Sequence, residues 1–433
     1  MTSSVSDLIA RDRRVVWHPF TQSALPDELL PIAGARGAIL VLEDGREIID
    51  GISSWWCTLH GHAHPKLVQA VARQADLLDH VLFAGCTHAP AVDLAEQVLS
   101  AVPAGFSKIF YSDNGSTAIE VALKMAVQFW SNHKQRRAGI LALEGSYHGD
   151  TFGAMAVGAR GLFSAPFEEM LFCVERLSTD GTAADLARCE ELCAGGTIAA
   201  FIFEPSVQGA AGMRMYPPEV IDRYQAICRK YGVLTIADEV MTGFGRTGPL
   251  FVSSVLVTPP DIMCLSKGLT GGVMPLAITA CTSEVFEAFR SPDFAKTFFH
   301  GHTFTANPIA CAVARASLEL TTSDACSAQR EFIEQAHVRC AARLREFPGI
   351  KDVRVRGTIL AFDVCVNDTP GYASSIRETA KRFFIERGIL LRPLGEVVYC
   401  MPPYCVSADQ LERIHAAMVE FAELQCATLL AAH

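Results

Sequence analysis

Residues 233–272 read VLTIADEVMTGFGRTGPLFVSSVLVTPPDIMCLSKGLTGG, and this stretch decides the fold. It contains two apolar runs, VLTIA and IMCL, each followed closely by a charged residue, Asp238 after the first and Lys267 after the second. Continuous apolar runs of this length are typical of strands buried on both faces of a parallel sheet. Because ligands of such sheets bind at the carboxyl ends of the strands, Asp238 and Lys267 are candidates for one site.

The alternation of apolar strand, turn and helix extends over residues 60–310. KIFYSD precedes the amphipathic STAIEVALKMAVQFW, and IAAFIFEP precedes PEVIDRYQAICRKYG. This pattern predicts an α/β fold in which a large domain holds a mostly parallel sheet flanked by helices.

Two flanking segments predict a second, smaller domain, because 433 residues exceed the size at which one core keeps growing. In residues 1–59, Asp44-Gly45 marks a hairpin between strand-like runs. Residues 311–433 alternate long helices with VRVRGTILAFDV, ILLRPLG and VVYCMPP. We expect the two segments to form one small α+β domain.

Composition and charge favour small molecules as partners. The net charge of -10 and the pI near 5.7 argue against binding a nucleic acid or an anionic membrane, since both need a cationic face. The fifteen cysteines are dispersed without a C-x-x-C pair, which indicates reduced core residues. The start MTSSVSDLIARDRRVVWHPF has no signal-peptide pattern, so we expect a cytoplasmic protein.

Lys267 differs from the other lysines of the chain in its surroundings. Lys124 and Lys381 lie in charged amphipathic segments, where a lysine is expected on a solvated helix face. Lys267 instead ends an apolar run and precedes Gly268, so it is expected where a buried strand turns sharply. Burial disfavours the lysine cation and leaves an amine that is nucleophilic toward an aldehyde. The alternative is a lysine that merely ends a strand.

Asp238 is the candidate partner of that lysine. Pyridoxal 5'-phosphate (PLP) carries an aldehyde and is an electron sink while its pyridine nitrogen is protonated, a state that a buried carboxylate favours. The separation of 267 − 238 = 29 residues leaves room for a loop and one further strand, so both side chains could reach one crevice. The alternative is an acid that caps the next helix.

Two turns are candidates for the phosphate and the ring of this cofactor. Gly115 and Ser116 stand where a strand gives way to a helix, and the free N–H groups of a helix start bind anions. Thr117 and Glu120 predict a capping box there. Tyr147, in GSYHGD, could stack on the pyridine ring. An ordinary capped helix and a surface loop are the alternatives.

Two other patterns are weaker. Gly243–Gly248 match G-x-G-x-x-G, but a dinucleotide fingerprint opens a helix directly after its strand, whereas Pro249 and the strand-like LFVSSVLV follow here. The hypothesis of an oxidoreductase that binds a nicotinamide cofactor has no support other than this match. His60, His62 and His64 lack a nearby acid or cysteine motif that would complete a ligand set, so we expect a turn and no metal.

Taken in order, these motifs resemble the class III (omega) aminotransferases of PLP fold type I over nearly the whole chain. The motifs are Gly115-Ser116, Tyr147-His148-Gly149, Glu204-Pro205, Asp238-Glu239 with GFGRTG, SKGLTGG around Lys267, and HGHTFTANP. The resemblance implies a PLP-dependent enzyme with a ping-pong mechanism, and a homodimer with active sites at the subunit interface.

The resemblance also implies residue roles. Lys267 would bond to the cofactor and shuttle protons, Asp238 would meet the pyridinium nitrogen, and Tyr147 would stack on the ring. Gly115 and Ser116 would hold the phosphate, which Thr303 of the neighbouring subunit would also reach. The residues implied at the substrates are Phe20, Trp55, Trp56, Arg246, Gly301, Arg392 and Tyr399, with Arg392 meeting a carboxylate.

Several stretches, among them WHPF, DGISSWW and LLRPLGEVVYCMPPY, resemble the branch that transfers an amino group to 8-amino-7-oxononanoate in biotin synthesis. Familiar members that use S-adenosylmethionine have Tyr where this chain has Phe20, and members with this Phe and with His302 resemble those that accept lysine. The amino donor therefore stays open.

Another omega-aminotransferase is the leading alternative. Members that act on ornithine or 4-aminobutyrate tend to carry a Glu in a QGEAG-like turn, whereas residues 208–212 read QGAAG. A cofactor-free interaction protein with the same fold is a further alternative.

Overall fold

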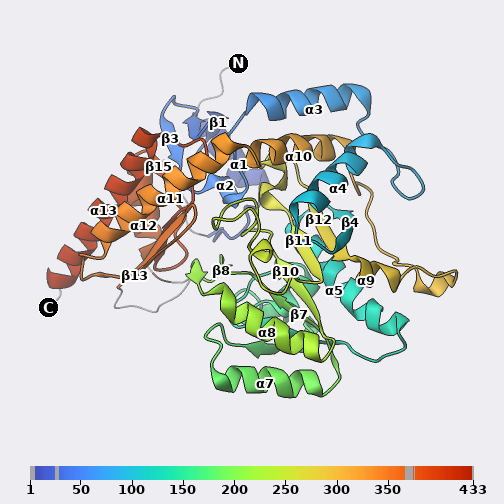
Figure 1. Ribbon diagram of the computed structural model, residues 1–433. Helices are drawn as coiled ribbons and strands as arrows, with labels where there is room; N and C mark the ends of the chain where they lie inside the picture. The colour runs from blue at the N-terminus through green and yellow to red at the C-terminus, as the bar shows by residue number, and fades with distance from the viewer. Residues whose placement is uncertain (1–4, 25–28, 366–373, 375, 432–433) are drawn as a thin grey trace.

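The computed structural model describes residues 5–24, 29–365, 374 and 376–431 (Figure 1). Its centre is a seven-stranded sheet with the order β4-β12-β11-β10-β7-β5-β6. β12 runs antiparallel to both of its neighbours, and the other pairings are parallel. The predicted mostly parallel sheet is therefore confirmed. The strands are β4 (Phe106–Ser112), β5 (Gly139–Leu143), β6 (Glu175–Leu177), β7 (Ile198–Phe203), β10 (Leu234–Asp238), β11 (Ile262–Leu265) and β12 (Ala277–Thr282).

The central strands are apolar throughout because both faces of the sheet are covered. All six residues of β7 and all four of β11 are buried. In β5, Ile140 and Ala142 belong to the core under α5, whereas Leu141 and Leu143 belong to the core on the opposite face. Successive side chains of a strand point to opposite faces, so two helix layers explain the absence of polar alternation.

Helices form the two layers seen in Figure 1. α5 (Gly115–Asn132) packs on one face against the central strands. The opposite core includes residues of several helices. These are α4 (Ala89–Ala101), α7 (Ala183–Ala194), α8 (Pro218–Lys230) and α10 (Pro308–Thr321). Other elements of this region are α3 (Pro65–Leu77), α6 (Phe152–Val157), η1 (Ala165–Met170), β8 (Val207–Gln208), β9 (Arg214–Met215), η2 (Val252–Ser254), η3 (Lys267–Thr270), α9 (Ser283–Glu287) and η4 (Phe294–Lys296).

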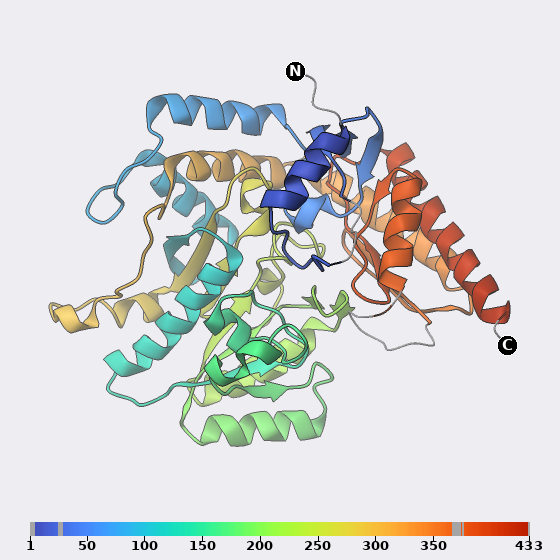
Figure 2. The ribbon, with the colours of Figure 1, turned by 180° about the vertical axis from the view of Figure 1, so that it is seen from behind.

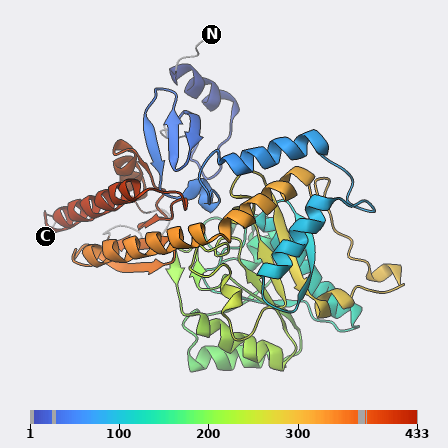
Figure 3. The same cartoon turned by 45° about the horizontal axis from the view of Figure 1, so that its top comes forward.

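The N-terminal and C-terminal segments lie side by side, as Figures 2 and 3 show from two further sides, and they share a sheet. The hairpin of β2 (Ile39–Leu42) and β3 (Glu47–Asp50) turns at Asp44-Gly45 as predicted, and β3 pairs in parallel with β15 (Ile389–Leu390). The remaining elements are α1 (Val5–Val15), β1 (Ile32–Arg36), α2 (Ser53–Trp56), α11 (Asp324–Leu344), β13 (Ile350–Arg356), β14 (Ile359–Val364), α12 (Ile376–Glu386), β16 (Val397–Cys400) and α13 (Ala408–Ala431). Residues from both ends of the chain therefore lie in one sheet, and the division of the chain into domains stays a prediction.

α11 joins the two parts of the molecule. Ile333 and Ala336 belong to the large core, whereas Cys340 and Leu344 belong to the core of the C-terminal sheet. Figure 3 shows this helix running from the central region toward the C-terminal helices. One continuous helix therefore contributes to both cores.

Two local predictions were wrong. The apolar LFVSSVLV forms the short η2 rather than a strand, because Glu239 accepts hydrogen bonds from the N–H groups of Val252 and Ser253, at 3.1 and 2.7 Å, and holds a turn there. The capping box at the start of α5 is made by Asn114 and Thr117, one turn before the predicted pair. Within the described ranges no helix is both long and apolar enough to cross a membrane.

Candidate active site

A cavity of about 950 Å³ lies at the carboxyl ends of the central strands. Asp238 ends β10, and Lys267 follows β11. These two strands are parallel neighbours in which Asp238 pairs with Cys264, so Asp238 and Lys267 are brought to one edge of the sheet. The predicted residues that line the cavity are Phe20, Trp55, Trp56, Gly115, Ser116, Tyr147, Asp238, Lys267, Arg392 and Tyr399.

Lys267 stands where the chain leaves β11. Its backbone has a positive φ of 31°, which is rare for a residue with a side chain and reflects the sharp turn into η3. Its Nζ lies 5.3 Å from the centre of the Trp56 ring. Burial lowers the pKa of Lys267 from its usual value, and the nearby carboxylates of Asp238 and Glu204 oppose this shift. The site therefore favours the neutral, nucleophilic amine.

We expect Lys267 of the cofactor-free protein to react with formaldehyde and borohydride at a lower pH than an exposed lysine does. Only the uncharged amine attacks an aldehyde, so a lowered pKa moves the onset of reaction to lower pH. Exposed Lys351 on β13 is the comparison within the same molecule. Peptide mass spectrometry over a pH series measures the extent of modification of both lysines. If both begin to react at the same pH, the proposed effect of burial on Lys267 is contradicted.

Asp238 is held in place by two hydrogen bonds at the floor of the cavity. Its Oδ2 lies 2.7 Å from Nδ1 of His148, and its Oδ1 accepts from the N–H of Val240 at 3.0 Å. The side chain of His148 is fully buried, and its Nε2 has no hydrogen-bond partner among the described residues. The carboxylate is thus fixed in orientation.

Glu204 is a second buried acid beside this pair. Its two oxygens accept from the N–H groups of Tyr147 and Gly209, at 3.0 and 3.1 Å. Burial raises the pKa of Glu204 to about 7, while His148 lowers it in part. The side chain therefore holds the Tyr147 turn against the turn of residues 208–212.

The start of α5 opens into the cavity. Gly115 and Ser116 are its first residues, and both line the cavity. A Cβ at Gly115 would lie 2.7 Å from Cγ1 of Val240, so only glycine fits this approach. Free N–H groups at the start of this eighteen-residue helix form an anion site, and Tyr147 lies on the same cavity wall.

The opposite part of the cavity is aromatic and includes the cation of Arg392. The guanidinium of Arg392 lies 4.5 Å from the Trp55 ring and 5.9 Å from the Phe20 ring. Trp56 Nε1 donates to the hydroxyl of Tyr399 at 2.9 Å. An elongated molecule with an anionic end could reach from Arg392 to Lys267.

Comparison with known proteins shows the family. The model of the family described as "Aminotransferase class-III" matches residues 22–421. This chain belongs to the class III aminotransferases. Members of the family depend on PLP.

Among curated relatives, the adenosylmethionine-8-amino-7-oxononanoate aminotransferase of Synechococcus elongatus is 48% identical over 416 residues, covering 94% of this chain and 97% of that protein. The protein of the same name from Corynebacterium glutamicum is 38% identical, with 94% and 96% covered.

Solved structures agree with this assignment. That of the adenosylmethionine-8-amino-7-oxononanoate aminotransferase from Methanocaldococcus jannaschii has a TM-score of 0.91 at 31% identity, covering 96% of this chain and 99% of that chain. An amine transaminase from an uncultivated Pseudomonas species, in its PLP-bound form, has a TM-score of 0.86 at 30% identity, with 95% and 99% covered.

Three predicted residues do not line the cavity of this aminotransferase. Arg246 is buried behind it, where Nη1 donates to the carbonyl of Pro402 at 2.8 Å and Nη2 to that of Trp56 at 3.5 Å. Gly301 and Thr303 lie in an exposed loop between η4 and α10. Their assigned roles stay predictions.

Three residues that help to build the site received no role from the sequence. His148 and Glu204 stand within motifs that gave no role to these two side chains, and no sequence pattern singled out Asp50. For Glu204 a signal existed, since it ends the apolar IAAFIF as Asp238 ends its own strand. His148 follows Tyr147 in an irregular turn, so no periodicity indicated where its ring points.

Proposed function

We propose that this chain transfers an amino group to 8-amino-7-oxononanoate and forms 7,8-diaminononanoate in biotin synthesis. The observation that carries the proposal is the 48% identity, over 94% of the chain, to the relative named for this reaction. A coarser function, amino-group transfer with PLP, follows from the family itself.

The cavity offers a place for each end of such a substrate. An amino-oxo acid of this length has a reacting carbonyl near one end and a carboxylate at the other. Lys267 would work at the carbonyl, and Arg392, backed by Trp55 and Phe20, would pair with the carboxylate. Apolar side chains between them suit the hydrocarbon chain.

The described residues fit PLP. When bound, PLP supplies an aldehyde and an electron sink for carbon–nitrogen chemistry. Lys267 would hold it covalently, and the carboxylate of Asp238 would face its ring nitrogen. Gly115 and Ser116 would hold the phosphate through the start of α5, and Tyr147 would stack on the ring. The buried Nε2 of His148, which has no partner among the residues that the structure describes, indicates a polar neighbour other than these residues.

The protein's own contribution to the reaction is mainly the movement of one proton. The Lys267 amine, whose pKa burial lowers, would accept a proton from the substrate carbon at Nζ and then return it. Trp56 and Tyr399 would close the wall beside Nζ and exclude water.

We also propose that the enzyme works as a cytoplasmic homodimer. Thr303 is exposed and outside the cavity of its own subunit, which supports a role at the cofactor phosphate of the other subunit. Sedimentation measurements would test the assembly. Mixing subunits that carry Lys267→Ala with subunits that carry Thr303→Ala would test the shared site, since a mixed dimer holds one intact site.

The amino donor is either S-adenosylmethionine or lysine. Phe20 lines the cavity and lies edge-on to Trp55, with ring centres 5.9 Å apart, so no hydroxyl is present at this position. Mixing the yellow holoenzyme with each amine in turn would identify the donor as the one that bleaches it.

Growth of a biotin auxotroph blocked at this single step would test the acceptor. We expect the gene to restore growth without biotin. Soluble, yellow protein that fails to restore growth would favour the second candidate, another omega-aminotransferase of the same family.

Replacing Arg392 with Ala is expected to raise KM for 8-amino-7-oxononanoate by roughly 10- to 100-fold, because a charge-assisted pair with the carboxylate is lost. The methyl ester of the same acceptor should be affected much less. Steady-state kinetics with both acceptors measures the difference. Arg188→Ala, which removes a surface arginine paired with Glu175, is the matched control. Equal effects on acid and ester would refute the assignment.

A further inference from the structure

The turn that carries Trp55 and Trp56 has an unusual backbone. Residues Ser53–Trp56, which we call the tryptophan turn, include three non-glycine residues with positive φ, namely Ser53 at 51°, Ser54 at 58° and Trp56 at 68°. L-residues rarely adopt this conformation, and such strain persists only where surrounding contacts hold it. The turn therefore needs an anchor.

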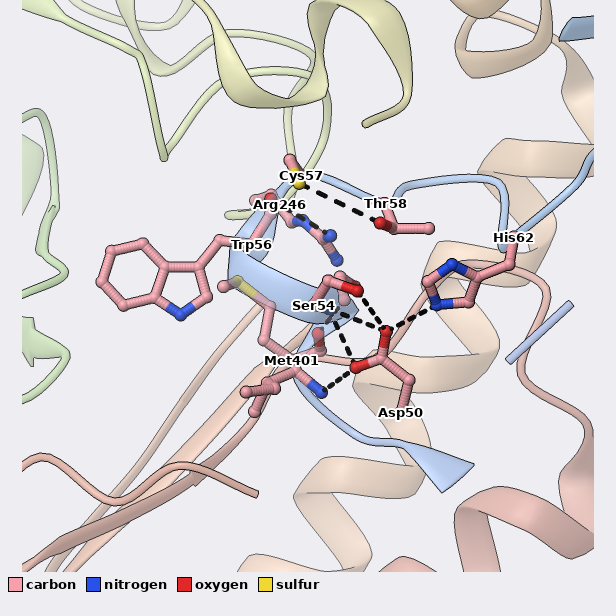
Figure 4. A network of polar contacts seen from close by, with 10 residues as sticks. Asp50, Ser54, Trp56, Cys57, Thr58, His62, Arg246 and Met401 are labelled. Carbon is pink, nitrogen blue, oxygen red and sulfur yellow. Dashed lines mark hydrogen bonds and ion pairs between the residues drawn. The ribbon is translucent and has the colours of Figure 1, made fainter. Parts of the chain in front are cut away.

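Asp50 is that anchor. It is fully buried at the end of β3, and its Oδ2 accepts from Ser54 N–H at 2.7 Å and from Ser54 Oγ at 3.0 Å (Figure 4). Its Oδ1 accepts from Ser54 N–H at 2.8 Å and from Ile52 N–H at 3.3 Å. The most strained residue, Ser54 with ψ of −87°, is thus held by both carboxylate oxygens.

The carboxylate is itself fixed from the other side. His62 Nε2 lies 2.9 Å from Asp50 Oδ2, as Figure 4 shows. The backbone of His62 pairs with Gly37 through hydrogen bonds of 2.7 and 3.0 Å. Ser53 Oγ donates to the carbonyl of Met401 at 2.9 Å. The turn is therefore tied to β3, to the chain near Gly37 and to the C-terminal segment.

The tryptophan turn forms part of the wall of the candidate active site. Trp55 lies 4.5 Å from the Arg392 guanidinium, and Trp56 lies 5.3 Å from Lys267 Nζ. Asp50 is absent from the cavity lining among the described residues. Asp50 therefore does not contact the substrate directly, and its hydrogen bonds to Ile52 and Ser54 connect it to the cavity wall through the turn.

We propose that Asp50 is a positioning residue of the acceptor site, which holds the tryptophan turn in its strained form and thereby sets the place of Trp55 against Arg392. This inference rests on the proposed function, because the acceptor carboxylate is what Arg392 would bind. If the inference holds, the carboxylate of Asp50 contributes to recognition of the acceptor without contacting the acceptor.

The test starts with Asp50→Ala in the holoenzyme. We expect KM for 8-amino-7-oxononanoate to rise by roughly tenfold or more, while kcat and the content of bound PLP change much less. Asp44→Ala is the matched control, since Asp44 lies in the same hairpin but is exposed, and its carboxylate accepts hydrogen bonds from Arg46 at the surface. An unchanged KM in Asp50→Ala would overturn the proposal.

Rescue by glycine separates positioning from a general loss of stability. Glycine adopts the φ and ψ of Ser54 without steric cost. The double variant Asp50→Ala/Ser54→Gly should therefore have a KM closer to that of the wild type than Asp50→Ala has. Because Ser54→Gly also relieves strain and so raises stability, the unfolding temperature is measured beside KM, and a merely structural role would show the two changing together. Failure of rescue would therefore count against the proposal.

A double-mutant cycle with Trp55→Ala tests whether Asp50 acts on the acceptor site through the tryptophan turn. If Asp50 acts through the turn, the effects of Asp50→Ala and Trp55→Ala on kcat/KM should be clearly less than additive. Additive effects would contradict the proposal. If Asp50→Ala does not fold, Asp50→Asn enters the same cycle, because its amide oxygen still accepts from Ser54 N–H.

Near-ultraviolet circular dichroism of the holoenzyme reports the fixed indole rings without any substrate. We expect Asp50→Ala to weaken this signal and Ser54→Gly to restore it. If the wild-type enzyme does not accept 8-amino-7-oxononanoate, the proposed function fails. The circular dichroism would then still decide whether Asp50 holds the turn.

Discussion

Replacing Lys267 with Ala is expected to lower turnover by roughly 10⁴-fold, the upper end of what one acid–base group contributes, because this lysine would also carry the cofactor. Its side chain lines the cavity, and burial lowers its pKa from the usual value, which makes the nucleophilic free amine easier to form. Single-turnover kinetics with added PLP measures the loss.

Borohydride treatment of the holoenzyme followed by peptide mapping provides the second measurement. The label should appear on Lys267 in the wild type and disappear in Lys267→Ala. Lys351→Ala is the control, since Lys351 lies exposed on β13. A label on another side chain would refute the proposed mechanism. A colourless protein that takes up no PLP would favour the alternative of an interaction protein that keeps the fold but binds no cofactor.

Replacing Asp238 with Asn is expected to lower kcat by roughly 10²- to 10³-fold, because it removes the charge that would keep the ring nitrogen of PLP protonated. The geometry should survive, since the amide oxygen can still accept from the N–H of Val240 and the amide nitrogen can donate to His148.

A cofactor analogue makes this second prediction specific. PLP methylated at its ring nitrogen is permanently cationic, so it should restore part of the activity of Asp238→Asn. Glu239→Gln is the control, because Glu239 directly follows the same strand but accepts its hydrogen bonds from Thr242, Val252 and Ser253. If Asp238→Asn keeps wild-type kcat with PLP, the assigned role is wrong.

The local pattern of the sequence predicted the sheet well. Apolar runs such as IAAFIF and IMCL can be buried on both faces only in a sheet covered by two helix layers, and the structure has those layers. The pattern failed at LFVSSVLV because a buried acid outside the segment, Glu239, holds its backbone in a turn.

The candidate site was predictable where strand ends fix it. Asp238 and Lys267 end adjacent parallel strands, so periodicity and chain direction suffice to bring them together. Arg246 was less predictable. Its motif lies beside the site in the sequence, yet its guanidinium turns away to the carbonyls of Pro402 and Trp56.

The sequence by itself determined the layered fold and the choice of Lys267 and Asp238 as candidate site residues. Hydrophobic periodicity acts over a few residues, so it identifies the strands and the side chains that stand at their ends. Only the tertiary structure decided that Asp50 anchors the tryptophan turn and that Trp55 meets Arg392. These contacts join residues whose side-chain directions depend on strained backbone angles and on segments hundreds of positions apart, and no local pattern encodes either.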